Sequence, residues 1–585
     1  MRSSSIPSAQ LLVNHCKAFG ISRIVIAPGS RNAPLIISFT EDPYFHCYSI
    51  VDERCAAFFA LGMAQQLKKP VAVLCTSGSA LLNFYPAIAE AFYSDIPLVL
   101  ISADRPSYKI DIGDGQTIRQ DDVFDRHIGY SANLKQDVTH ATETLRALDP
   151  SMINNESSLE NTQSGIDHYN LKELRTALKT ASEKHTPVHI NIPFEEPLYD
   201  TVPANGERLP DQDRIETSTT VTENLSEFLE TWNAASRKMV LVGVYTPNSL
   251  EQEIIESLAN DPSVLVFTET TSNLHHPHFL PSIDSIIAPI ENSPKKAELF
   301  KELQPQILLT FGGLIVSKKI KAFLRKYKPQ HHWHIHEKKA YDTFFGLTHH
   351  FKYPANSFLK SFLSKSIKKD SPYQKKWLSV KEHYSKRREV YLDEISFSDT
   401  LVFAHIVKSI PQDYMVQLAN SSTVRYAQLF DMHPSVKVFC NRGTSGIDGS
   451  TSTAIGASLH QKEPTVLITG DLSFFYDSNG LWNNYMRPDF RIIVINNDGG
   501  GIFRILPGKE DTQNFEDYFE TTHGLEAKNM CNLYQLHYQV ARNEIDLKKA
   551  LNTFYDSSDR PKVLEIKTPR KLNDRILLAY FDFIS

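Results

Sequence analysis

The stretch TVLITGDLS, residues 465–473, places an acidic residue directly after an apolar segment that is typical of a buried β-strand. The stretch RIIVINNDGG, residues 491–500, repeats this arrangement with two asparagines and a glycine turn. Asp471 and Asn497 are 497 − 471 = 26 residues apart, which suits one strand–helix–strand crossover. Because ligands of open parallel sheets bind beyond the carboxyl ends of the strands, we expect both side chains in one crevice.

These residues offer oxygen atoms of three kinds. Asp471 has a carboxylate, Asn497 has an amide oxygen, and Gly499 in the glycine turn has a backbone carbonyl. Such a set suits Mg²⁺, which takes few protein ligands and shares the rest with phosphate and water. The pattern therefore predicts a metal site at Asp471, Asn497 and Gly499. The alternative is that Asp471 caps the next helix and the glycine run is only a turn.

Strands and helices alternate along the chain in three blocks, which predicts an α/β fold with parallel sheets covered by helices on both faces. The polar stretch 151–165 is interpreted as a loop inside the first block, because VHINIP (188–193) still resembles one of its strands. The stretch 201–214, rich in Pro, Gly and Asp, is interpreted as a linker. We expect three doubly wound parallel-sheet domains, at residues 1–198, 215–360 and 375–585.

Composition excludes several other classes of protein. A chain of 585 residues is too long for one core. Its net charge of −6 gives no reason to expect nucleic acid or an anionic membrane as a partner. The six cysteines form no C-x-x-C pair, and no apolar run approaches the ~18 residues of a membrane span. The N-terminus has no apolar signal core, so we expect a cytoplasmic protein.

The spacing from Gly470-Asp471 to Asn496-Asn497 resembles the metal motif of the thiamine-diphosphate-dependent enzyme superfamily. The resemblance implies thiamine diphosphate and Mg²⁺ (or Mn²⁺) as cofactors. It also implies that the first domain binds the pyrimidine ring and the third binds the diphosphate. Further cofactor contacts are expected from Asn420, Ile447, Leu472 and Ser473.

Members of this superfamily use a glutamate of the first domain to hydrogen-bond the aminopyrimidine ring and so promote loss of the thiazolium C2 proton. The matching stretch here is YSIVDERCAAFF, residues 48–59, and the resemblance makes Glu53 the catalytic candidate. The alternative makes Asp52 and Glu53 acidic residues at a helix start, where the helix dipole favours negative charge. Both interpretations can hold at once.

Other motifs resemble one branch of the superfamily, the synthases of menaquinone biosynthesis. That branch decarboxylates 2-oxoglutarate and adds the succinyl-semialdehyde carbanion equivalent to isochorismate by a 1,4-addition. In this chain Leu472 stands where the superfamily usually has a second glycine. The other stretches that carry the resemblance are APGSRNAPL (27–35), SADRP (102–106), GQTIRQ (115–120), NSSTVR (420–425) and NRGTSGIDG (441–449).

Both substrates are dicarboxylates, and arginine binds a carboxylate through two parallel hydrogen bonds. The resemblance assigns the succinyl side to Ser421, Arg425 and Arg442, and isochorismate to Ser30, Arg31, Arg105, Gln116 and Lys318. A lone arginine is more often a solvated residue or one partner of a surface ion pair. Lys319 stands where the branch often has arginine, and a solvated helix face is at least as good an interpretation for it.

Two alternatives to this function remain open. One is another thiamine-diphosphate-dependent 2-oxoacid decarboxylase or lyase, and the other is a non-catalytic binding protein that retains the fold. The stretch HHWHIH (331–336) could suggest a metal site, but its alternation favours a strand with His332, His334 and His336 on one face. Because the superfamily places the cofactor between the first domain of one chain and the third of another, we expect at least a homodimer.

Overall fold

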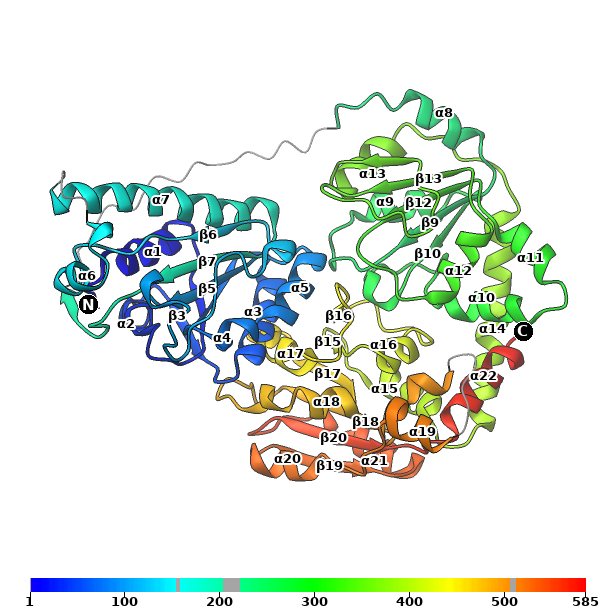
Figure 1. Cartoon of the computed structure of the whole chain (residues 1–585). Coiled ribbons are helices and arrows are strands. Elements are labelled where there is room, and N and C mark those ends of the chain that lie inside the picture. Colours follow the sequence, from blue (N-terminus) through cyan, green and yellow to red (C-terminus); the bar gives the residue numbers. More distant parts are fainter. Residues whose placement is uncertain (1, 154–157, 204–220, 506–511) are drawn as a thin grey trace. The chain divides into compact units, whose positions relative to one another are not determined.

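The computed structural model describes residues 2–153, 158–203, 221–505 and 512–585. The chain packs as two compact units (Figure 1). Unit 1 comprises residues 1–215, 443–462 and 475–490. Unit 2 comprises residues 216–442, 463–474 and 491–585. Three six-stranded parallel sheets confirm the predicted α/β class, one in unit 1 and two in unit 2.

The sheet of unit 1 has the strand order β3-β2-β4-β5-β7-β6. Strands β4 and β5 are buried along their whole length, as expected for a parallel sheet covered on both faces. The strands are β2 (Arg23–Ile26), β3 (His46–Ser49), β4 (Val71–Cys75), β5 (Leu98–Asp104), β6 (Ser131–Asn133) and β7 (Val188–Pro193). The helices around the sheet include α1 (Pro7–Ala18), α2 (Ala33–Glu41), α3 (Glu53–Leu67), α5 (Tyr85–Ser94) and α7 (Leu159–Lys184).

Unit 1 also contains helix α17 (Ser450–Ser458), which packs closely against α3. A Cβ atom on Gly62 would lie 2.0 Å from the carbonyl oxygen of Thr453. A Cβ atom on Gly456 would lie 2.0 Å from the carbonyl oxygen of Phe59. The two glycines therefore let the helix backbones approach more closely than any larger residue would allow.

The central sheet, in unit 2, has the order β11-β10-β9-β12-β13-β14. Its strands are β9 (Lys238–Val242), β10 (Val264–Phe267), β11 (Phe279–Leu280), β12 (Ile307–Phe311), β13 (His331–Ile335) and β14 (His349–Phe351). The histidine stretch forms β13, as predicted. His332 and His334 both contact the hydroxyl of Thr310, at 3.0 and 2.8 Å, which puts them on one face of the sheet.

The third sheet, also in unit 2, has the order β16-β15-β17-β18-β20-β19. Its strands are β15 (Met415–Leu418), β16 (Lys437–Cys440), β17 (Thr465–Gly470), β18 (Arg491–Asn496), β19 (His537–Ala541) and β20 (Lys562–Lys567). The parallel pairing of β17 and β18 ends with Gly470 opposite Ile495. The ends of these two strands are therefore neighbours, as the sequence spacing predicts.

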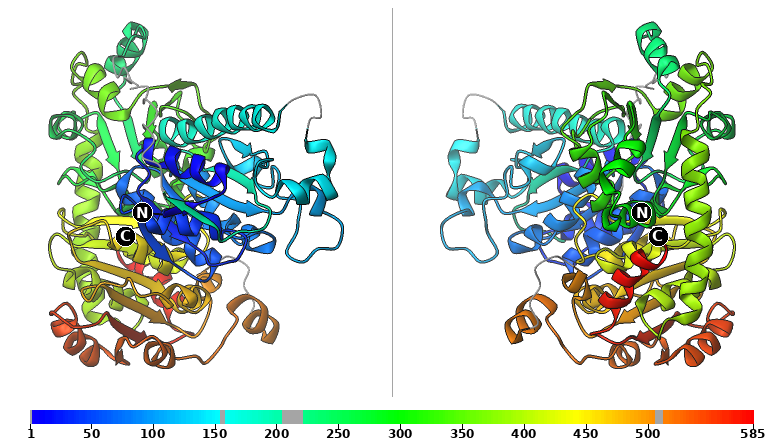
Figure 2. Two further views of the ribbon diagram at one scale, coloured as in Figure 1. Left: turned by 90° about the vertical axis from the view of Figure 1, so that its left-hand side faces the viewer. Right: turned by 90° about the vertical axis from the view of Figure 1, so that its right-hand side faces the viewer.

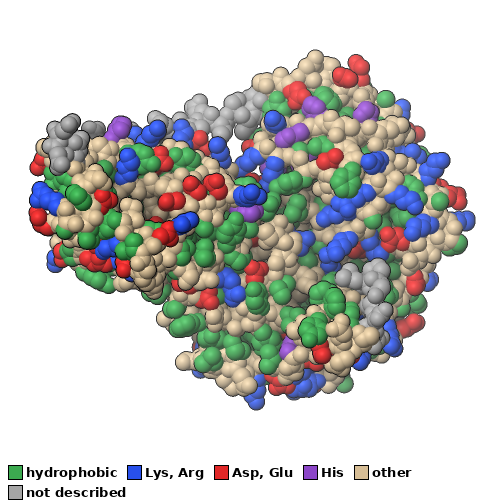
Figure 3. Space-filling view, in the orientation of Figure 1, with side chains coloured by type: hydrophobic (Ala, Val, Ile, Leu, Met, Phe, Trp, Pro, Cys, Tyr) green, Lys and Arg blue, Asp and Glu red, His purple; other side chains and the backbone are tan. Residues whose placement is uncertain are grey.

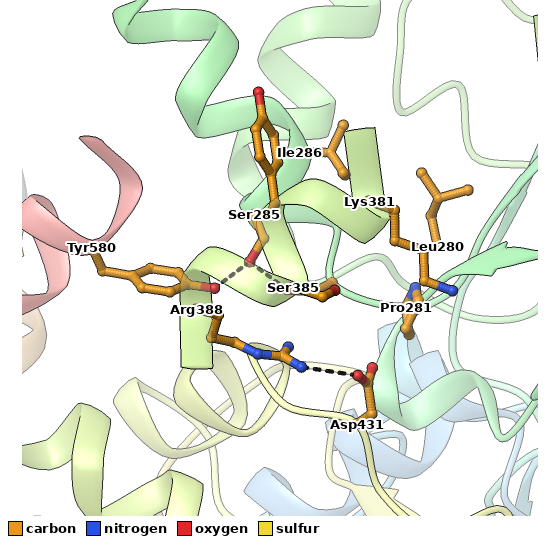
Figure 4. Close-up of a pocket in the computed structure, with 11 residues that line it drawn as sticks. Leu280, Pro281, Ser285, Ile286, Lys381, Ser385, Arg388, Asp431 and Tyr580 are labelled. Carbon is orange, nitrogen blue, oxygen red and sulfur yellow. Dashed lines mark hydrogen bonds and ion pairs between the residues drawn. The ribbon is translucent and has the colours of Figure 1, made fainter. Parts of the chain in front are cut away.

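Helices cover the faces of the sheets in the views of Figure 2. In unit 2 they include α10 (Ile283–Asn292), α12 (Lys318–Lys326), α14 (Tyr373–Glu394), α16 (Ser422–Ala427) and α22 (Asn573–Phe583). Helix α18 (Asp471–Tyr476) begins in unit 2, and its last two residues belong to unit 1. A small pocket lies where α10, α14 and α22 meet (Figure 4). Arg388 pairs with Asp431 beside it, and the hydroxyl groups of Ser285 and Tyr580 are 3.1 Å apart.

One predicted loop is partly wrong. Residues 159–165 form the first two turns of α7, which begins after Ser158. The Ser158 hydroxyl accepts the backbone N–H of Asn161 and so caps the helix. In the predicted linker, Thr201–Pro203 forms strand β8, which pairs antiparallel with β1 (Arg2–Ser4). The rest of that linker lies outside the described residues.

The surface carries charges of both signs. On the face seen in Figure 3, Lys and Arg side chains are interspersed with Asp and Glu side chains over both units. Within the described ranges, none of the helices is long and apolar enough to cross a membrane.

Candidate active site

Polar side chains follow the carboxyl ends of four neighbouring strands of the third sheet. Asn420 and Ser421 follow β15, Arg442 follows β16, Asp471 follows β17 and Asn497 follows β18. In the strand order these are β16, β15, β17 and β18, which are adjacent. The structure therefore gathers these five residues at one edge of one sheet, where open parallel sheets bind ligands.

Asp471 is held by groups on both of its oxygens and is only 3% exposed. Its Oδ2 accepts the backbone N–H of Gly499 at 2.9 Å, and its Oδ1 accepts the N–H of Leu472 at 2.7 Å. His523 Nε2 lies 3.3 Å from Oδ2, and this hydrogen bond raises the pKa of His523. Asp471 does begin α18, but it also reaches across to the end of the next strand.

The nitrogen and the oxygen of the Asn497 side-chain amide have different surroundings. Its Nδ2 donates to Asp399 Oδ2 at 3.0 Å, and Asp399 Oδ1 accepts the Thr568 hydroxyl at 2.6 Å. Burial raises the pKa of Asp399 to about 6. Asn497 Oδ1 is buried and has no hydrogen-bond partner in the part of the chain that the structure describes. A buried acceptor without a donor costs about 1–3 kcal/mol, which a bound cation would offset.

This cluster fits a hard divalent cation. The unpaired oxygen of Asn497 lies at the strand end beside Asp471, and Gly499 has φ 141°, a conformation that favours glycine. Among the described residues no group of three or more His, Cys, Asp and Glu could hold a metal ion. A site with one carboxylate, one amide oxygen and one carbonyl would suit Mg²⁺, which completes its shell with phosphate and water.

Arg442 and Asn420 form a second cluster at the same edge. Arg442 is 9% exposed, and its Nη1 donates to Asn420 Oδ1 at 2.7 Å. Asn420 Nδ2 donates in turn to the carbonyl of Asn441 at 2.7 Å. Next to Asn420, Ser421 has φ 67° and turns the chain into α16, which carries Arg425.

Two acids that the sequence did not single out, Glu269 and the half-buried Asp284, interact with the charges of these arginines. Glu269 lies after β10 and is 2% exposed, and its oxygens accept the N–H groups of Val316 and Ser317 at 2.8–2.9 Å. Burial raises its pKa to about 7. Asp284, on α10, accepts the hydroxyl of Ser317. The charge of Arg442 favours the ionised form of Glu269, and that of Arg425 the ionised form of Asp284, against the effect of burial.

The lysine pair at the start of α12 has two different environments. Lys318 is exposed, whereas Lys319 Nζ pairs with Glu291 Oε2 at 2.5 Å. Lys319 Nζ also lies 5.8 Å from the centre of the Phe581 ring. These contacts are those of an ion pair on a helix face, and they favour the interpretation of Lys319 as a helix-surface residue.

Unit 1 holds the other candidates, again after the carboxyl ends of parallel strands. Ser30 and Arg31 follow β2; Ser30 is exposed, while Arg31 is 3% exposed. Arg31 Nη1 donates to the carbonyl of Phe194 at 2.9 Å, and its Nη2 pairs with Glu196 at 2.5 Å. An internal carboxylate thus occupies the guanidinium that was predicted to bind substrate.

Arg105 and Gln116 lie on a loop that follows β5. Arg105 Nη2 donates to the carbonyl of Gly115 at 3.1 Å, and its own N–H donates to Asp104. Burial raises the pKa of Asp104 to about 6. Gln116 has φ 57°, and its carbonyl accepts the hydroxyl of Ser77 at 2.9 Å. This loop is therefore fixed to the end of the neighbouring strand β4.

Glu53 is the first residue of α3. Asp52 caps the helix by accepting the N–H of Cys55 at 3.0 Å, so the helix-start interpretation is confirmed. Glu53 itself is half-buried, and its Oε2 accepts Asn83 Nδ2 at 3.2 Å. Its catalytic role stays a prediction.

The remaining cofactor candidates are divided between the two units, with Ile447 in unit 1 and Leu472 and Ser473 in unit 2. Ile447 belongs to a loop whose start is held by the buried Glu90, which accepts the N–H groups of Gly443 and Thr444 at 2.7 Å. Leu472 and Ser473 follow Asp471 in α18; Leu472 is half-buried and Ser473 is buried.

Comparisons with known proteins agree with this arrangement. Residues 7–126 match the thiamine pyrophosphate enzyme N-terminal TPP binding domain, residues 213–417 the middle domain, and residues 420–566 the C-terminal TPP binding domain.

Among its relatives, the chain is 54% identical over 585 residues to a protein of Christiangramia forsetii, covering 100% of both chains. It is 51% identical over 579 residues to a protein of Flavobacterium johnsoniae, covering 98% of both. A Porphyromonas gingivalis protein is 36% identical over 97% of this chain and 95% of its own. All three are named 2-succinyl-5-enolpyruvyl-6-hydroxy-3-cyclohexene-1-carboxylate synthase. The chain therefore belongs to this synthase family of the thiamine pyrophosphate enzymes.

Proposed function

We propose that this chain decarboxylates 2-oxoglutarate and adds the resulting succinyl fragment to isochorismate, the carboligation that the name of its relatives describes. The observation that carries the proposal is the strand-end edge of the third sheet. There, a buried oxygen of Asn497 has no donor within the described residues, and Arg442 follows a neighbouring strand. One edge thus offers ligands for a cation and a donor for carboxylates.

Asp471, Asn497 and the Gly499 carbonyl would hold Mg²⁺ or Mn²⁺ against the diphosphate of the cofactor. When bound, thiamine diphosphate supplies a carbon that stabilises a carbanion. Glu53 would exchange a proton with the aminopyrimidine ring. Within the described part of the chain, its half-buried carboxylate has a single hydrogen bond, to Asn83 at 3.2 Å, which supports a group that can change partners. Asn420, Ile447, Leu472 and Ser473 would line the cofactor.

Substrate binding would fall to the basic residues. Arg425 and Arg442, with Ser421, would bind the succinyl part, and the carboxylates of 2-oxoglutarate would compete there with Asp284 and Glu269. Isochorismate would contact Ser30, Arg31, Arg105, Gln116 and Lys318. Arg31 would have to exchange Glu196 for a substrate carboxylate. Lys319 is left out of this set because Glu291 pairs with it.

We further propose a cytoplasmic homodimer or larger assembly, in which Glu53 of one chain serves the cofactor held by another. The domain boundaries 1–198, 215–360 and 375–585 belong to the same proposal. They are supported by the division of the strands among three sheets.

The test is an assay of the purified protein with thiamine diphosphate, Mg²⁺, 2-oxoglutarate and isochorismate. Loss of isochorismate absorbance that requires 2-oxoglutarate supports the carboligase. Decarboxylation of 2-oxoglutarate without any consumption of isochorismate favours a plain decarboxylase or lyase. Cofactor binding without turnover of either substrate favours a binding protein that retains the fold.

A further inference from the structure

The first turn of α3 is tied down on both sides of Glu53 by one short segment of unit 1. Asn479 Nδ2 donates to Asp52 at 2.8 Å. Arg54 Nη2 donates to the carbonyl of Tyr476 at 2.9 Å, and its guanidinium lies 4.7 Å from the centre of the Tyr476 ring. These contacts hold the residue before Glu53 and the residue after it, while Glu53 keeps only its bond to Asn83 among the described residues.

Asp477 is the fully buried residue of the segment that contacts the first turn of α3. Its Oδ2 accepts the backbone N–H of Ser452 at 2.7 Å, and its Oδ1 accepts the Ser452 hydroxyl at 2.9 Å. The thiol of Cys55 lies 3.5 Å from the same Oδ1. Ser452 is in the first turn of α17, so one carboxylate joins the starts of α17 and α3.

Asp477 has no place in the proposed chemistry, yet its position is unfavourable for a carboxylate. Burial raises its pKa to about 7, against the effect of the hydrogen bonds from Ser452. The carboxylate is kept here although a neutral side chain would fill the space at a lower desolvation cost. Besides capping α17 through Ser452, it contacts Cys55, two residues after Glu53.

We propose that Asp477 is a positioning residue that sets the direction of Glu53 by fixing the first turn of α3. The inference rests on the proposed role of Glu53. The Glu53 side chain has one hydrogen bond among the described residues, at 3.2 Å, so its direction depends on how the first turn of α3 is fixed. Residues 476–479 contact that turn through the side chains of Asp52, Arg54 and Cys55. Positioning errors of this kind change rates strongly, since about 1 Å of misplacement can lower a rate 10²-fold.

Unit 1 offers a matched control, Asp137. It is also buried, and it accepts both the backbone N–H and the hydroxyl of one serine at a helix start, Ser8, at 3.0 and 2.6 Å. Gln163 donates to its other oxygen at 2.8 Å. Asp137 therefore has the same type of bonding as Asp477, but it serves α1 and makes no hydrogen bond to α3 among those described.

The experiment compares Asp477→Asn, Asp137→Asn and the unaltered full-length protein in two measurements. The first is backbone amide hydrogen–deuterium exchange of residues 52–58 without cofactor, followed by mass spectrometry. We expect Asp477→Asn to speed this exchange about tenfold and Asp137→Asn to leave it unchanged.

The second measurement is hydrogen–deuterium exchange at C2 of bound thiamine diphosphate with no substrate present. We expect Asp477→Asn to slow it about 10- to 100-fold, while cofactor affinity changes less than about threefold. Unchanged C2 exchange, or equal slowing in Asp137→Asn, overturns the proposal. Slowed C2 exchange in Asp477→Asn with unchanged amide exchange of residues 52–58 also overturns the proposal, because the effect would then not arise from a change in α3.

Asn479→Ala provides a second variant if Asp477→Asn does not fold, since its bond to Asp52 is exposed. It should change both measurements in the same direction by about threefold, and no change in either overturns the proposal. Failure of the proposed function is seen separately. If the unaltered protein does not consume isochorismate but still exchanges the C2 proton, the proposed carboligation is wrong and the role of Asp477 can still be tested. If Glu53→Gln exchanges the C2 proton at the normal rate, the proposed role of Glu53 is wrong.

Discussion

Asp471 and Glu53 are acids that each begin a helix, α18 and α3, and the protein holds them in opposite ways. The carboxylate of Asp471 is bound on both oxygens, by the N–H groups of Gly499 and Leu472. Around Glu53, hydrogen bonds hold the flanking residues Asp52 and Arg54. Glu53 has one hydrogen bond among the described residues, at 3.2 Å. The difference suits the proposed roles. A metal ligand must keep one orientation, whereas a group that exchanges a proton needs a fixed backbone and a carboxyl group that can change partners.

Removing the bound acid should have the larger effect. Asp471→Ala should abolish Mg²⁺-dependent binding of thiamine diphosphate, because the diphosphate loses its bridging cation. The melting temperature should then stop responding to cofactor plus Mg²⁺, and Glu53→Gln, as the control, should keep this response. An unchanged ligand-induced shift in Asp471→Ala would remove Asp471 from the metal site.

Changing the mobile acid should affect rate rather than binding. Glu53→Gln keeps the size of the side chain but cannot exchange a carboxyl proton, so turnover should fall by about 10²–10⁴. Cofactor affinity should fall much less, because Asp471 and Asn497 are intact. Exchange at C2 of the bound cofactor measures the step directly. Wild-type exchange in the variant would leave Glu53 as a helix-start carboxylate only.

Arg425 and Arg31 test whether the two substrates are bound by different sets of residues. Arg425→Ala should weaken use of 2-oxoglutarate by about 2–5 kcal/mol, the range for removing one partner of a buried charge pair. Arg31→Ala should act mainly on isochorismate, and less strongly, because Arg31 must first release Glu196. The measurement is kcat/KM for each substrate at a saturating level of the other. Equal impairment of both substrates by both variants would contradict this division.

Lys319 should give the smallest effect. Its contacts with Glu291 and Phe581 are those of a partly exposed ion pair, worth about 0–1 kcal/mol. Lys319→Ala should therefore lower the melting temperature slightly and leave KM for isochorismate within about twofold. Lys318→Ala is the matched comparison and should raise that KM. A larger rise in Lys319→Ala than in Lys318→Ala would return Lys319 to the substrate site.

The third sheet shows what a sequence can predict and why. Strands β17 and β18 are continuous apolar segments, and parallel pairing follows from the crossover between them, so Asp471 and Asn497 could be placed at one edge in advance. The sequence could not place Glu269 or Asp284 opposite the arginines. Their partners come from another sheet and from distant parts of the chain, and only tertiary packing brings them together.

Asp399 and the start of α7 show two further limits of prediction from sequence. Asp399 orients the amide of Asn497 from 98 positions away, and a lone acid in a polar stretch carries no such signal. The start of α7 was missed because residues 159–165 have the polar composition of a loop. Its cap at Ser158 and the core packing of Leu174 and Leu178 outweigh that local preference.

We expect that neither evolution nor protein engineering can easily insert or delete residues between Asp471 and Asp477. The two acids are 477 − 471 = 6 residues apart, and α18 fills the interval. One inserted residue would turn everything after it by about 100° around the helix axis. Asp471 and Asp477 could not then both keep the orientations that their proposed roles require. Homologous domains exchanged at this point would have to be cut before Asp471 or after Asn479, never between them.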